Sequence, residues 1–360
     1  MTIGLARKSL DQITPYKPGG TIEEFKRDLG LKKVIKLASN ENAAGPSPKA
    51  LKAIRKHLEE LHRYPDSDCF LLKRKLAARL GVKESMITVG NGSDEIILLA
   101  LRAFVGEEEE VVVANPTFLI YEVASRVAGA KVVEVPLKNF RYDLPRMKEA
   151  VTPKTKIIFI ANPDNPTGTY VKREEVEEFL KDLPRDLVVF FDEAYFEFVE
   201  EKDYPDTRRY LSKHSVILTR SFSKAYGLAG LRIGYGISNP EMADYLNRVR
   251  EPFNVNSLAQ AAALAALEDR DHLEKTRRMV REGRRFLYRH LDELGLRYLP
   301  SQTNFILVNV GDGKAIYEKL LKFGLLVRDM GAWKLEAFIR VTIGTMEENK
   351  RLVHVLKKIL

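Results

Sequence analysis

Short apolar runs alternate with amphipathic stretches from residue 48 to about residue 250. The apolar runs predict β-strands at residues 86–89, 111–114, 131–135, 156–161, 187–191 and 216–219. Amphipathic stretches at 93–105 and 118–128 predict helices between the first of these strands. Strands separated by helices indicate a mostly parallel α/β sheet sandwiched by helices, whose ligands bind beyond the carboxyl ends of the strands.

The pattern changes beyond residue 250. Residues 258–294 predict one long amphipathic helix that stops at Gly295, followed by short strands at 303–310 and 337–343 with helices between and after them. Prolines and glycines interrupt the first 40 residues. We therefore predict an N-terminal arm (1–40) that packs with the small domain, a large α/β domain (41–250) and a small C-terminal α+β domain (251–360).

Composition narrows the class of function. The net charge is +9, but the basic residues are mixed with Glu along helical stretches, which does not favour nucleic-acid binding. A preference for anionic small molecules would explain the positive charge as well. Cys69 is the only cysteine, which excludes a disulfide framework, and the six histidines show no metal-binding spacing. Residues 1–11 lack an apolar signal core, and no run approaches about 20 apolar residues, so we expect a cytoplasmic protein without a membrane span.

The richest stretch for chemistry is residues 219–235, which follows a predicted strand and contains Lys224. Burial and a nearby cation lower the pKa of a lysine, and the neutral amine attacks carbonyl groups. Ser221, Ser223 and Arg232 would suit a phosphate. A surface lysine in a glycine-rich loop is the alternative. The Ser-x-x-Lys motif of penicillin-binding proteins is not favoured, because its Ser-Asp-Asn and Lys-Thr-Gly partners are missing.

A second candidate is Asp192, which ends the apolar run 187–191 and precedes Tyr195 by three residues. Pyridoxal-phosphate (PLP) enzymes use an aspartate to keep the ring nitrogen protonated, and a buried carboxylate needs a cationic partner. A helix-capping aspartate on a surface loop is the alternative. A magnesium-binding aspartate of a P-loop enzyme is excluded, since the chain has no G-x-x-x-x-G-K-[ST] motif.

Three further loops follow predicted strands. In the Asn-Pro-rich turn 162–168, the Asn165 amide could donate to a cofactor oxygen or simply shape the turn. The glycine turn before the helix at 93 is typical of phosphate binding at a helix N-terminus, but Glu95 breaks the G-x-G-x-x-G pattern of NAD sites. Phe118 suits stacking on a planar ring or a place in the core.

Two arginines lie late in the chain. Arg340 interrupts an apolar strand, and Arg328 follows the apolar residues 325–327. Two guanidinium groups suit a carboxylate or a phosphate dianion, although each side chain could also reach solvent from a strand edge. Taken together, the candidates supply a lysine, a carboxylate, a phenol, an amide, a stacking ring and a phosphate cradle at successive strand ends, which are the parts that a PLP site requires.

This set of motifs resembles the fold-type I PLP-dependent aminotransferases and, within them, the histidinol-phosphate aminotransferase family. The resemblance spans residues 15–345 and is most specific at residues 221–224, 230–235 and 165–168, with 37–42 and 63–66 matching the subfamily. It implies a PLP-binding large domain and a small α+β domain. The implied reaction is transamination between L-histidinol phosphate and 2-oxoglutarate in histidine biosynthesis, giving imidazole-acetol phosphate and L-glutamate. A broad-specificity aromatic aminotransferase and a threonine-phosphate decarboxylase are the alternatives.

The resemblance also implies roles for single residues. Lys224 would form the Schiff base with PLP and move the substrate proton, Asp192 would pair with the ring nitrogen, and Tyr195 would bond the ring oxygen together with Asn165. The implied phosphate site comprises Ser221, Ser223, Arg232 and the backbone of Gly92, Ser93 and Asp94. The implied substrate contacts are Tyr16, Asn40, Asn165, Arg328 and Arg340.

Tyr64 is implied to reach the PLP phosphate of a neighbouring subunit, which makes a homodimer the expected assembly. The chain departs from the family pattern in two places. Phe118 stands where members often carry a stacking tyrosine, and Ala43-Ala44 occupies a loop where a proline is frequent. The first departure removes a hydroxyl that could bond the cofactor, and the second is expected to loosen the loop.

Overall fold

The computed structural model describes residues 10–11, 13, 22–30 and 33–360, and seven of their strands form the main sheet. The order is β2-β8-β7-β6-β5-β3-β4, and every neighbouring pair is parallel except the two pairs made by β8. Their bounds are β2 (Ile87–Gly90), β3 (Glu110–Asn115), β4 (Lys131–Pro136), β5 (Thr155–Ala161), β6 (Val188–Asp192), β7 (Val216–Ser221) and β8 (Gly234–Ile237). The mostly parallel sheet that the sequence predicts is confirmed.

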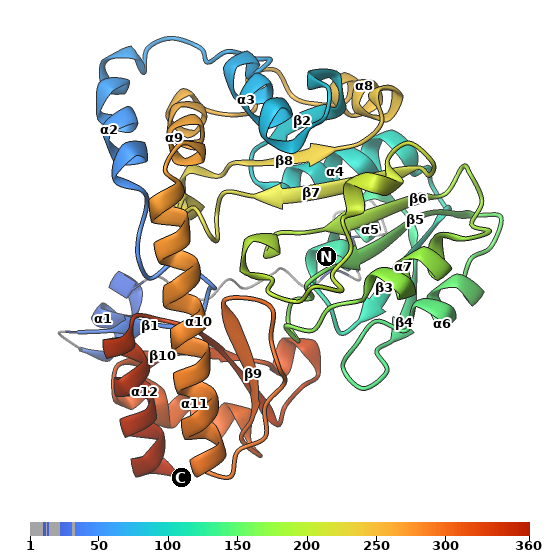
Figure 1. Cartoon of the computed structure of the whole chain (residues 1–360). Helices are drawn as coiled ribbons and strands as arrows, with labels where there is room; N and C mark the ends of the chain where they lie inside the picture. The colour runs from blue at the N-terminus through green and yellow to red at the C-terminus, as the bar shows by residue number, and fades with distance from the viewer. Residues whose placement is uncertain (1–9, 12, 14–21, 31–32) are drawn as a thin grey trace, which may run out of the picture.

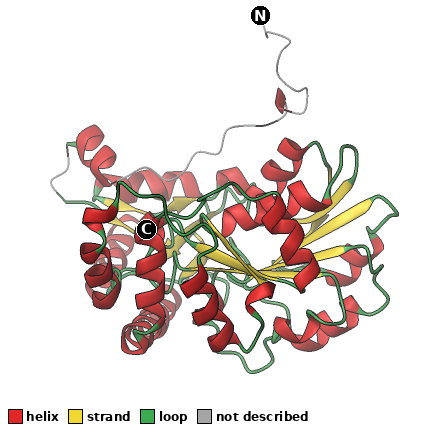
Figure 2. Cartoon of the chain, turned by 90° about the horizontal axis from the view of Figure 1, so that it is seen from above, coloured by secondary structure: helices red, strands yellow, loops and turns green. Residues whose placement is uncertain are grey.

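Helices cover both sides of this sheet (Figure 2). The helices of this part of the chain are α3 (Phe70–Leu80), α4 (Ser93–Phe104), α5 (Ile120–Ala128), α6 (Leu144–Glu149), α7 (Arg173–Leu180), α8 (Pro240–Arg248) and α9 (Ser257–Leu267), and α2 (Pro48–Lys56) packs on α9. The central strands β5, β6 and β7 are almost completely buried, because helices cover both of their faces. Within the described ranges, no helix is long and apolar enough to cross a membrane.

A second, smaller region lies at the lower end of the molecule in Figure 1. It contains an antiparallel sheet in the order β11-β12-β9 and a parallel pair of β1 with β10. The strands are β1 (Ile35–Lys36), β9 (Phe305–Asn309), β10 (Leu325–Leu326), β11 (Arg328–Asp329) and β12 (Phe338–Thr342). The helices are α1 (Ile22–Leu29), α10 (Arg270–Glu293), α11 (Gly313–Lys322) and α12 (Met346–Ile359).

The prediction of one continuous helix over residues 258–294 is wrong. The structure has two helices, α9 and α10, separated at Glu268 and Asp269. The Asp269 carboxylate accepts a hydrogen bond from the His272 backbone N–H and so caps α10, while Ser47 Oγ donates to the same carboxylate at 2.5 Å. An aspartate that caps a new helix competes with continuation of the preceding one, which the hydrophobic period alone does not reveal.

Two hydrophobic cores meet where the loops of the main sheet end. The larger core surrounds the seven strands, and the smaller one joins α10, α12, β9 and β12. Leu37, Tyr195 and Ala225 are buried in the smaller core, although Tyr195 and Ala225 belong to loops that follow β6 and β7. The carboxyl ends of these strands are thus fixed against the second region, and the polar residues beside them lie at the junction of the two cores.

Candidate active site

The candidate site residues come from loops at one edge of the main sheet. Strands β2, β3, β5, β6 and β7 run in the same direction, so their carboxyl ends meet there. Gly92 and Ser93 follow β2, Phe118 follows β3, and Asn165 follows β5. Asp192 ends β6, and Lys224 lies three residues beyond β7. The topology therefore brings groups from distant parts of the chain to one place.

Lys224 lies in a tightly held loop. Its neighbours Phe222 and Ala225 are completely buried, and its Nζ donates a hydrogen bond to the Ser39 carbonyl oxygen at 3.2 Å. Gly227 adopts a φ of +69°, and a Cβ atom at this position would collide with the Gly45 carbonyl oxygen, so the two loops approach each other closely because glycine is present.

The amine of Lys224 is easier to deprotonate than that of an ordinary lysine. Burial and the nearby positive charge of Arg340 together lower the pKa of Lys224 to about 8. Nζ also lies 5.8 Å from the centre of the Tyr195 ring. A lysine with this pKa has a useful neutral fraction near neutral pH, and the neutral amine is the nucleophilic form.

Asp192 is a buried carboxylate whose partners are neutral. Tyr121 OH donates to Oδ2 at 2.6 Å, and the Ala194 backbone N–H donates to Oδ1 at 3.1 Å. No lysine, arginine or histidine among the described residues pairs with this carboxylate, and burial raises its pKa to about 6. A buried carboxylate in this condition fits a cationic ring nitrogen, which would supply the missing positive charge.

Tyr121 was not predicted as part of the site. Its side chain is completely buried, its ring stacks on Phe159 at 4.8 Å, and its hydroxyl points to Asp192. Phe118 packs edge-on against Tyr121, with ring centres 5.5 Å apart. Phe118 precedes α5, and the Tyr121 backbone N–H donates to the Phe118 carbonyl oxygen at 3.1 Å, so a turn brings the two rings together. The spacing of three residues is the signal that could have identified Tyr121.

A phosphate-sized cradle lies where α4 begins. Gly92 precedes the helix without a capping side chain, so backbone N–H groups of its first turn remain available to an anion. Arg232 reaches the same place, donating to Asp94 Oδ2 at 3.1 Å and to Ser223 Oγ at 3.4 Å. Ser221 Oγ accepts from the Ser223 backbone N–H at 3.0 Å. A Cβ atom at Gly92 would come within 2.5 Å of Arg232 Nη2, so a larger residue would fill the cradle.

A polar network connects the smaller region to the loops of the main sheet. Asn40 is buried with a φ of +56°; its Nδ2 donates to Tyr195 OH at 2.9 Å, and its backbone N–H donates to Thr342 Oγ1 at 2.9 Å. The Arg340 guanidinium donates to Asn165 Oδ1 and, at 3.2 Å, to the Ala38 carbonyl oxygen. The predicted substrate residues Asn40, Asn165 and Arg340 thus lie in one connected group with Tyr195.

The remaining predicted residues differ in their placement. Arg328 faces Arg340 as its direct partner across β11 and β12. Tyr64 is 83% exposed and stacks on Phe253 at 4.6 Å, so the structure does not bring its ring into the group around Lys224. Tyr16 lies outside the described residues.

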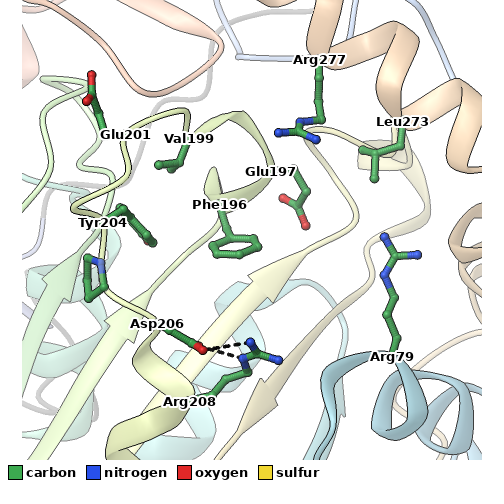
Figure 3. Close-up of a pocket in the computed structure, with 11 residues that line it drawn as sticks. Arg79, Phe196, Glu197, Val199, Glu201, Tyr204, Asp206, Arg208, Leu273 and Arg277 are labelled. Atoms are coloured by element: carbon green, nitrogen blue, oxygen red, sulfur yellow. Dashed lines mark hydrogen bonds and ion pairs between the residues drawn. The ribbon is translucent and has the colours of Figure 1, made fainter. Parts of the chain in front are cut away.

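A separate hollow of about 450 Å³ lies beside the short helix at Phe196–Phe198 (Figure 3). Three arginines and three carboxylates line it, and Arg208 is paired with Asp206 at 2.8 Å. None of its lining residues is a lysine or one of the predicted site residues. This hollow is therefore separate from the group of residues around Lys224.

The groups at the strand ends fit PLP. The amine of Lys224 would receive its aldehyde, the buried Asp192 would face its ring nitrogen, and the cradle at Gly92 and Arg232 would hold its phosphate. The half-buried ring of Phe118 follows β3 beside them. The fit rests on three independent features, namely an available amine, a buried uncompensated carboxylate and an open helix N-terminus.

Comparison with known proteins gives a consistent result. Residues 32–356 match the family model described as aminotransferase class I and II. Histidinol-phosphate aminotransferase from Moorella thermoacetica is 46% identical over 100% of this chain and 94% of its own length, and histidinol-phosphate aminotransferase 1 from Nitrosococcus oceani is 46% identical over 99% and 97%. The crystal structure of histidinol-phosphate aminotransferase from Sinorhizobium meliloti in complex with pyridoxal-5'-phosphate superimposes with a TM-score of 0.91 at 31% identity, covering 99% of this chain and 98% of that one. The chain therefore belongs to the aminotransferase class I and II family and, within it, to the histidinol-phosphate aminotransferase family.

Proposed function

We propose that this protein uses PLP to transaminate between L-histidinol phosphate and 2-oxoglutarate, giving imidazole-acetol phosphate and L-glutamate in histidine biosynthesis. The observation that carries the proposal is that two groups at one edge of the sheet have pKa values shifted in opposite directions. There the pKa of Lys224 is lowered to about 8, and that of the buried Asp192 is raised to about 6. Such pairs of shifted groups are typical of acid–base sites.

Each residue of the site contributes a distinct physical step. When bound, PLP would supply the electron sink for cleavage of the substrate Cα–H bond. Lys224 would hold the cofactor through its amine and, once that amine is free, would take the substrate α-proton on Nζ as general base. Asp192 would hold the ring nitrogen protonated through its negative charge, while Tyr121 fixes the carboxylate.

The remaining proposed roles concern binding. Tyr195 and Asn165 would bond the ring oxygen of the cofactor, and Phe118 would stack on the ring. Asn40, Asn165, Arg328, Arg340 and the undescribed Tyr16 would contact substrates. Arg340 would hold the glutamate carboxylate and, with Arg328, the phosphate of histidinol phosphate, because two guanidiniums match the charge of a dianion. Ser221, Ser223, Arg232 and the backbone of Gly92, Ser93 and Asp94 would hold the cofactor phosphate.

The assembly is part of the proposal. We propose a homodimer in which Tyr64 reaches the cofactor phosphate of the neighbouring subunit; its exposed ring stacked on Phe253 supports this role. We also propose the division into an arm (1–40), a large domain (41–250) and a small domain (251–360). The pairing of β1 with β10 supports the packing of the arm with the small domain, whereas α9 packs into the larger core and so belongs with the large domain. Because the proposed substrates are soluble metabolites, a cytoplasmic location is proposed as well.

The proposal is tested by colour and by turnover. Protein purified with PLP should show a visible absorbance band that borohydride treatment removes, and it should convert histidinol phosphate and 2-oxoglutarate. Lys224→Ala should still bind PLP non-covalently but lose the borohydride-fixed adduct and the turnover. Lys213→Ala, at an exposed lysine in the loop before β7, is the matched control. Turnover retained by Lys224→Ala, or a preference for phenylalanine or threonine phosphate in a competition assay, would refute the assignment.

The shared site is tested separately by mixing two defective chains. Tyr64→Ala lacks the proposed neighbour contact, and Lys224→Ala lacks the amine. In a mixed dimer, the Lys224 of one chain would meet the Tyr64 of the other, so one intact site should form. Refolding the two variants together should raise cofactor affinity and activity above those of either variant alone. No gain in a mixture shown to contain mixed dimers would contradict the role of Tyr64 and leave the role of Lys224 untouched.

A further inference from the structure

We infer that Trp333 is a positioning residue that sets Arg328 and Arg340 as a preformed clamp for a doubly charged phosphate group and thereby favours phosphorylated substrates over glutamate. This inference rests on the proposed function and adds to the site a residue that the sequence analysis did not predict. Trp333 is the only tryptophan of the chain and lies in the short segment Gly331–Trp333 between the strands that carry the two arginines.

The first observation is the placement of the arginines. Arg328 and Arg340 are direct partners in the antiparallel pair of β11 and β12, and Arg340 is buried. Side chains directly opposite each other in an antiparallel pair lie close together on one face of the sheet. This placement suits a phosphate dianion, because two guanidiniums can each donate to its oxygens.

The second observation is the indole ring that both arginines share. The guanidinium carbon of Arg328 lies 5.2 Å from the centre of the Trp333 ring, and that of Arg340 lies 5.6 Å from it. Tryptophan offers the most favourable aromatic face for a cation within about 6 Å. The ring is therefore placed to attract both cations, which favours positions of the two side chains around one aromatic ring.

The third observation is the anchor of the ring itself. Trp333 is 3% exposed, packs with Leu307 and Met330, and its Nε1–H donates to the Thr117 carbonyl oxygen at 2.8 Å. Thr117 precedes Phe118, and its hydroxyl donates to the buried Asp164 at 2.9 Å. The indole is thus held from the loop that carries the proposed stacking ring, so the arginine pair is tied to the position of the cofactor.

The three observations predict a selective effect. The Arg340 guanidinium also donates hydrogen bonds to Asn165 and to the Ala38 carbonyl oxygen, so these contacts can hold it in place to bind a single carboxylate without the indole. Arg328 is half-buried, and its described aromatic contact is with Trp333. Loss of the ring should therefore harm the two-arginine clamp more than the one-arginine contact, and binding of histidinol phosphate should suffer more than binding of glutamate.

Two substitutions separate the ring from its anchor. Trp333→Leu removes the aromatic face, and Trp333→Phe keeps a face but loses the Nε1–H donor. In single-turnover assays of each half-reaction on PLP-loaded enzyme, Trp333→Leu should raise the half-saturating concentration of histidinol phosphate about tenfold. That of glutamate should change less than about twofold, and the maximal rate should hold. Trp333→Phe should fall between Trp333→Leu and the native chain.

A matched control tests for a merely structural role. Leu335 is half-buried against the same cluster as Trp333 and is not a proposed site residue. Leu335→Ala should lower the melting temperature without changing the ratio of the two half-saturating concentrations. Equal losses for both substrates in Trp333→Leu, or the same ratio change in Leu335→Ala, would overturn the inference.

The tryptophan also gives a readout that needs no catalysis. Because the chain has one tryptophan, inorganic phosphate bound between the arginines should change its fluorescence in a saturable way, and Arg328→Leu should weaken that response about tenfold. An unchanged fluorescence signal in native protein, with binding verified by calorimetry, would overturn the inference. If native protein fails to transaminate histidinol phosphate although phosphate still changes the tryptophan fluorescence, the proposed function is contradicted and the inference about the arginine clamp is kept.

Discussion

The two sides of the candidate site use opposite electrostatics. At the carboxyl edge of the main sheet, Asp192 is a buried negative charge with neutral partners, beside an amine of lowered pKa. In the small antiparallel sheet, Arg328 and Arg340 place two positive charges opposite each other. A buried carboxylate without a cationic partner costs stability, and the two guanidiniums bring like charges to opposite positions of one strand pair.

The two sides of the site therefore suit partners of opposite charge. A buried carboxylate is compensated by a cation, and a pair of guanidiniums is compensated by an anion with two charges. The main-sheet edge therefore suits the protonated ring nitrogen of the cofactor, and the small sheet suits the charged end of the substrate. Five measurements test this difference between the two sides, and they follow from the largest expected effect to the smallest.

The largest effect is expected for Asp192→Asn, which removes the negative charge and keeps the shape. The ring nitrogen would lose its stabilising partner, and kcat should fall at least about 100-fold. Binding of PLP should persist, as judged by absorbance. A kcat within about threefold of the native value would contradict the electrostatic role of Asp192.

The same variant should stabilise the cofactor-free chain. Burial raises the pKa of Asp192 from 3.8 to about 6, so the charged carboxylate costs stability above about pH 6, and this cost disappears as the pH falls below about 4. At pH 7.5, Asp192→Asn should raise the free energy of unfolding by about 1–3 kcal/mol. Urea denaturation at pH 7.5 and pH 4 measures this gain, which should vanish at the lower pH.

The next effect separates the two arginines. Arg340→Lys should weaken both substrates by about 100-fold in kcat/KM, because Arg340 is buried and holds Asn165. Arg328→Lys should weaken histidinol phosphate about tenfold and leave glutamate nearly unchanged. Steady-state kinetics with each substrate varied in turn distinguishes these outcomes. Equal effects of both substitutions on both substrates would contradict the separate roles of the two arginines.

A smaller effect is expected for Tyr121→Phe. The hydroxyl of Tyr121 donates to the charged form of Asp192, so its removal should raise the pKa of Asp192 further. A hydrogen bond to a charged group contributes about 1.5–3 kcal/mol, and part of this should appear as a roughly tenfold loss in kcat. The acidic limb of the pH–rate profile should move to higher pH, whereas a shift to lower pH would contradict the contact.

The smallest effect concerns the pH dependence of cofactor capture. The pKa of Lys224 is lowered to about 8, so the neutral amine fraction grows with pH and is nearly complete above about pH 9. The rate at which cofactor-free protein traps PLP should rise up to this range and then level off, as followed by stopped-flow absorbance. A rate that continues to rise towards pH 10.5 would indicate an ordinary lysine.

The main sheet was predictable because its strands are long apolar runs. Burial on both faces leaves a continuous hydrophobic signal at β5, β6 and β7. Their following loops carry the polar residues that pointed to the site, since parallel strands bring their carboxyl ends together. The chemistry of Lys224 and Asp192 was therefore accessible from order along the chain and residue type.

Other features depend on pairing that a sequence does not specify. Strands β1, β10 and β11 have two residues each, and β8 has four with two glycines, so their own signals are weak. The register that places Arg328 opposite Arg340 follows from these pairings. The break before α10 and the contact of Tyr121 with Asp192 likewise depend on side-chain hydrogen bonds rather than on hydrophobic period.

Asn40 has a consequence for how the protein matures on the ribosome. Its backbone N–H bonds to Thr342, which is 302 residues further along the chain, and its carbonyl oxygen accepts from Asn304. Residues around Asn40 are thus synthesised early, whereas their hydrogen-bond partners are synthesised near the end of translation. A chain that ends before residue 342 lacks the Thr342 contact, and one that ends before residue 304 lacks both, so the hydrogen bonds that hold Asn40 are completed only near the end of synthesis.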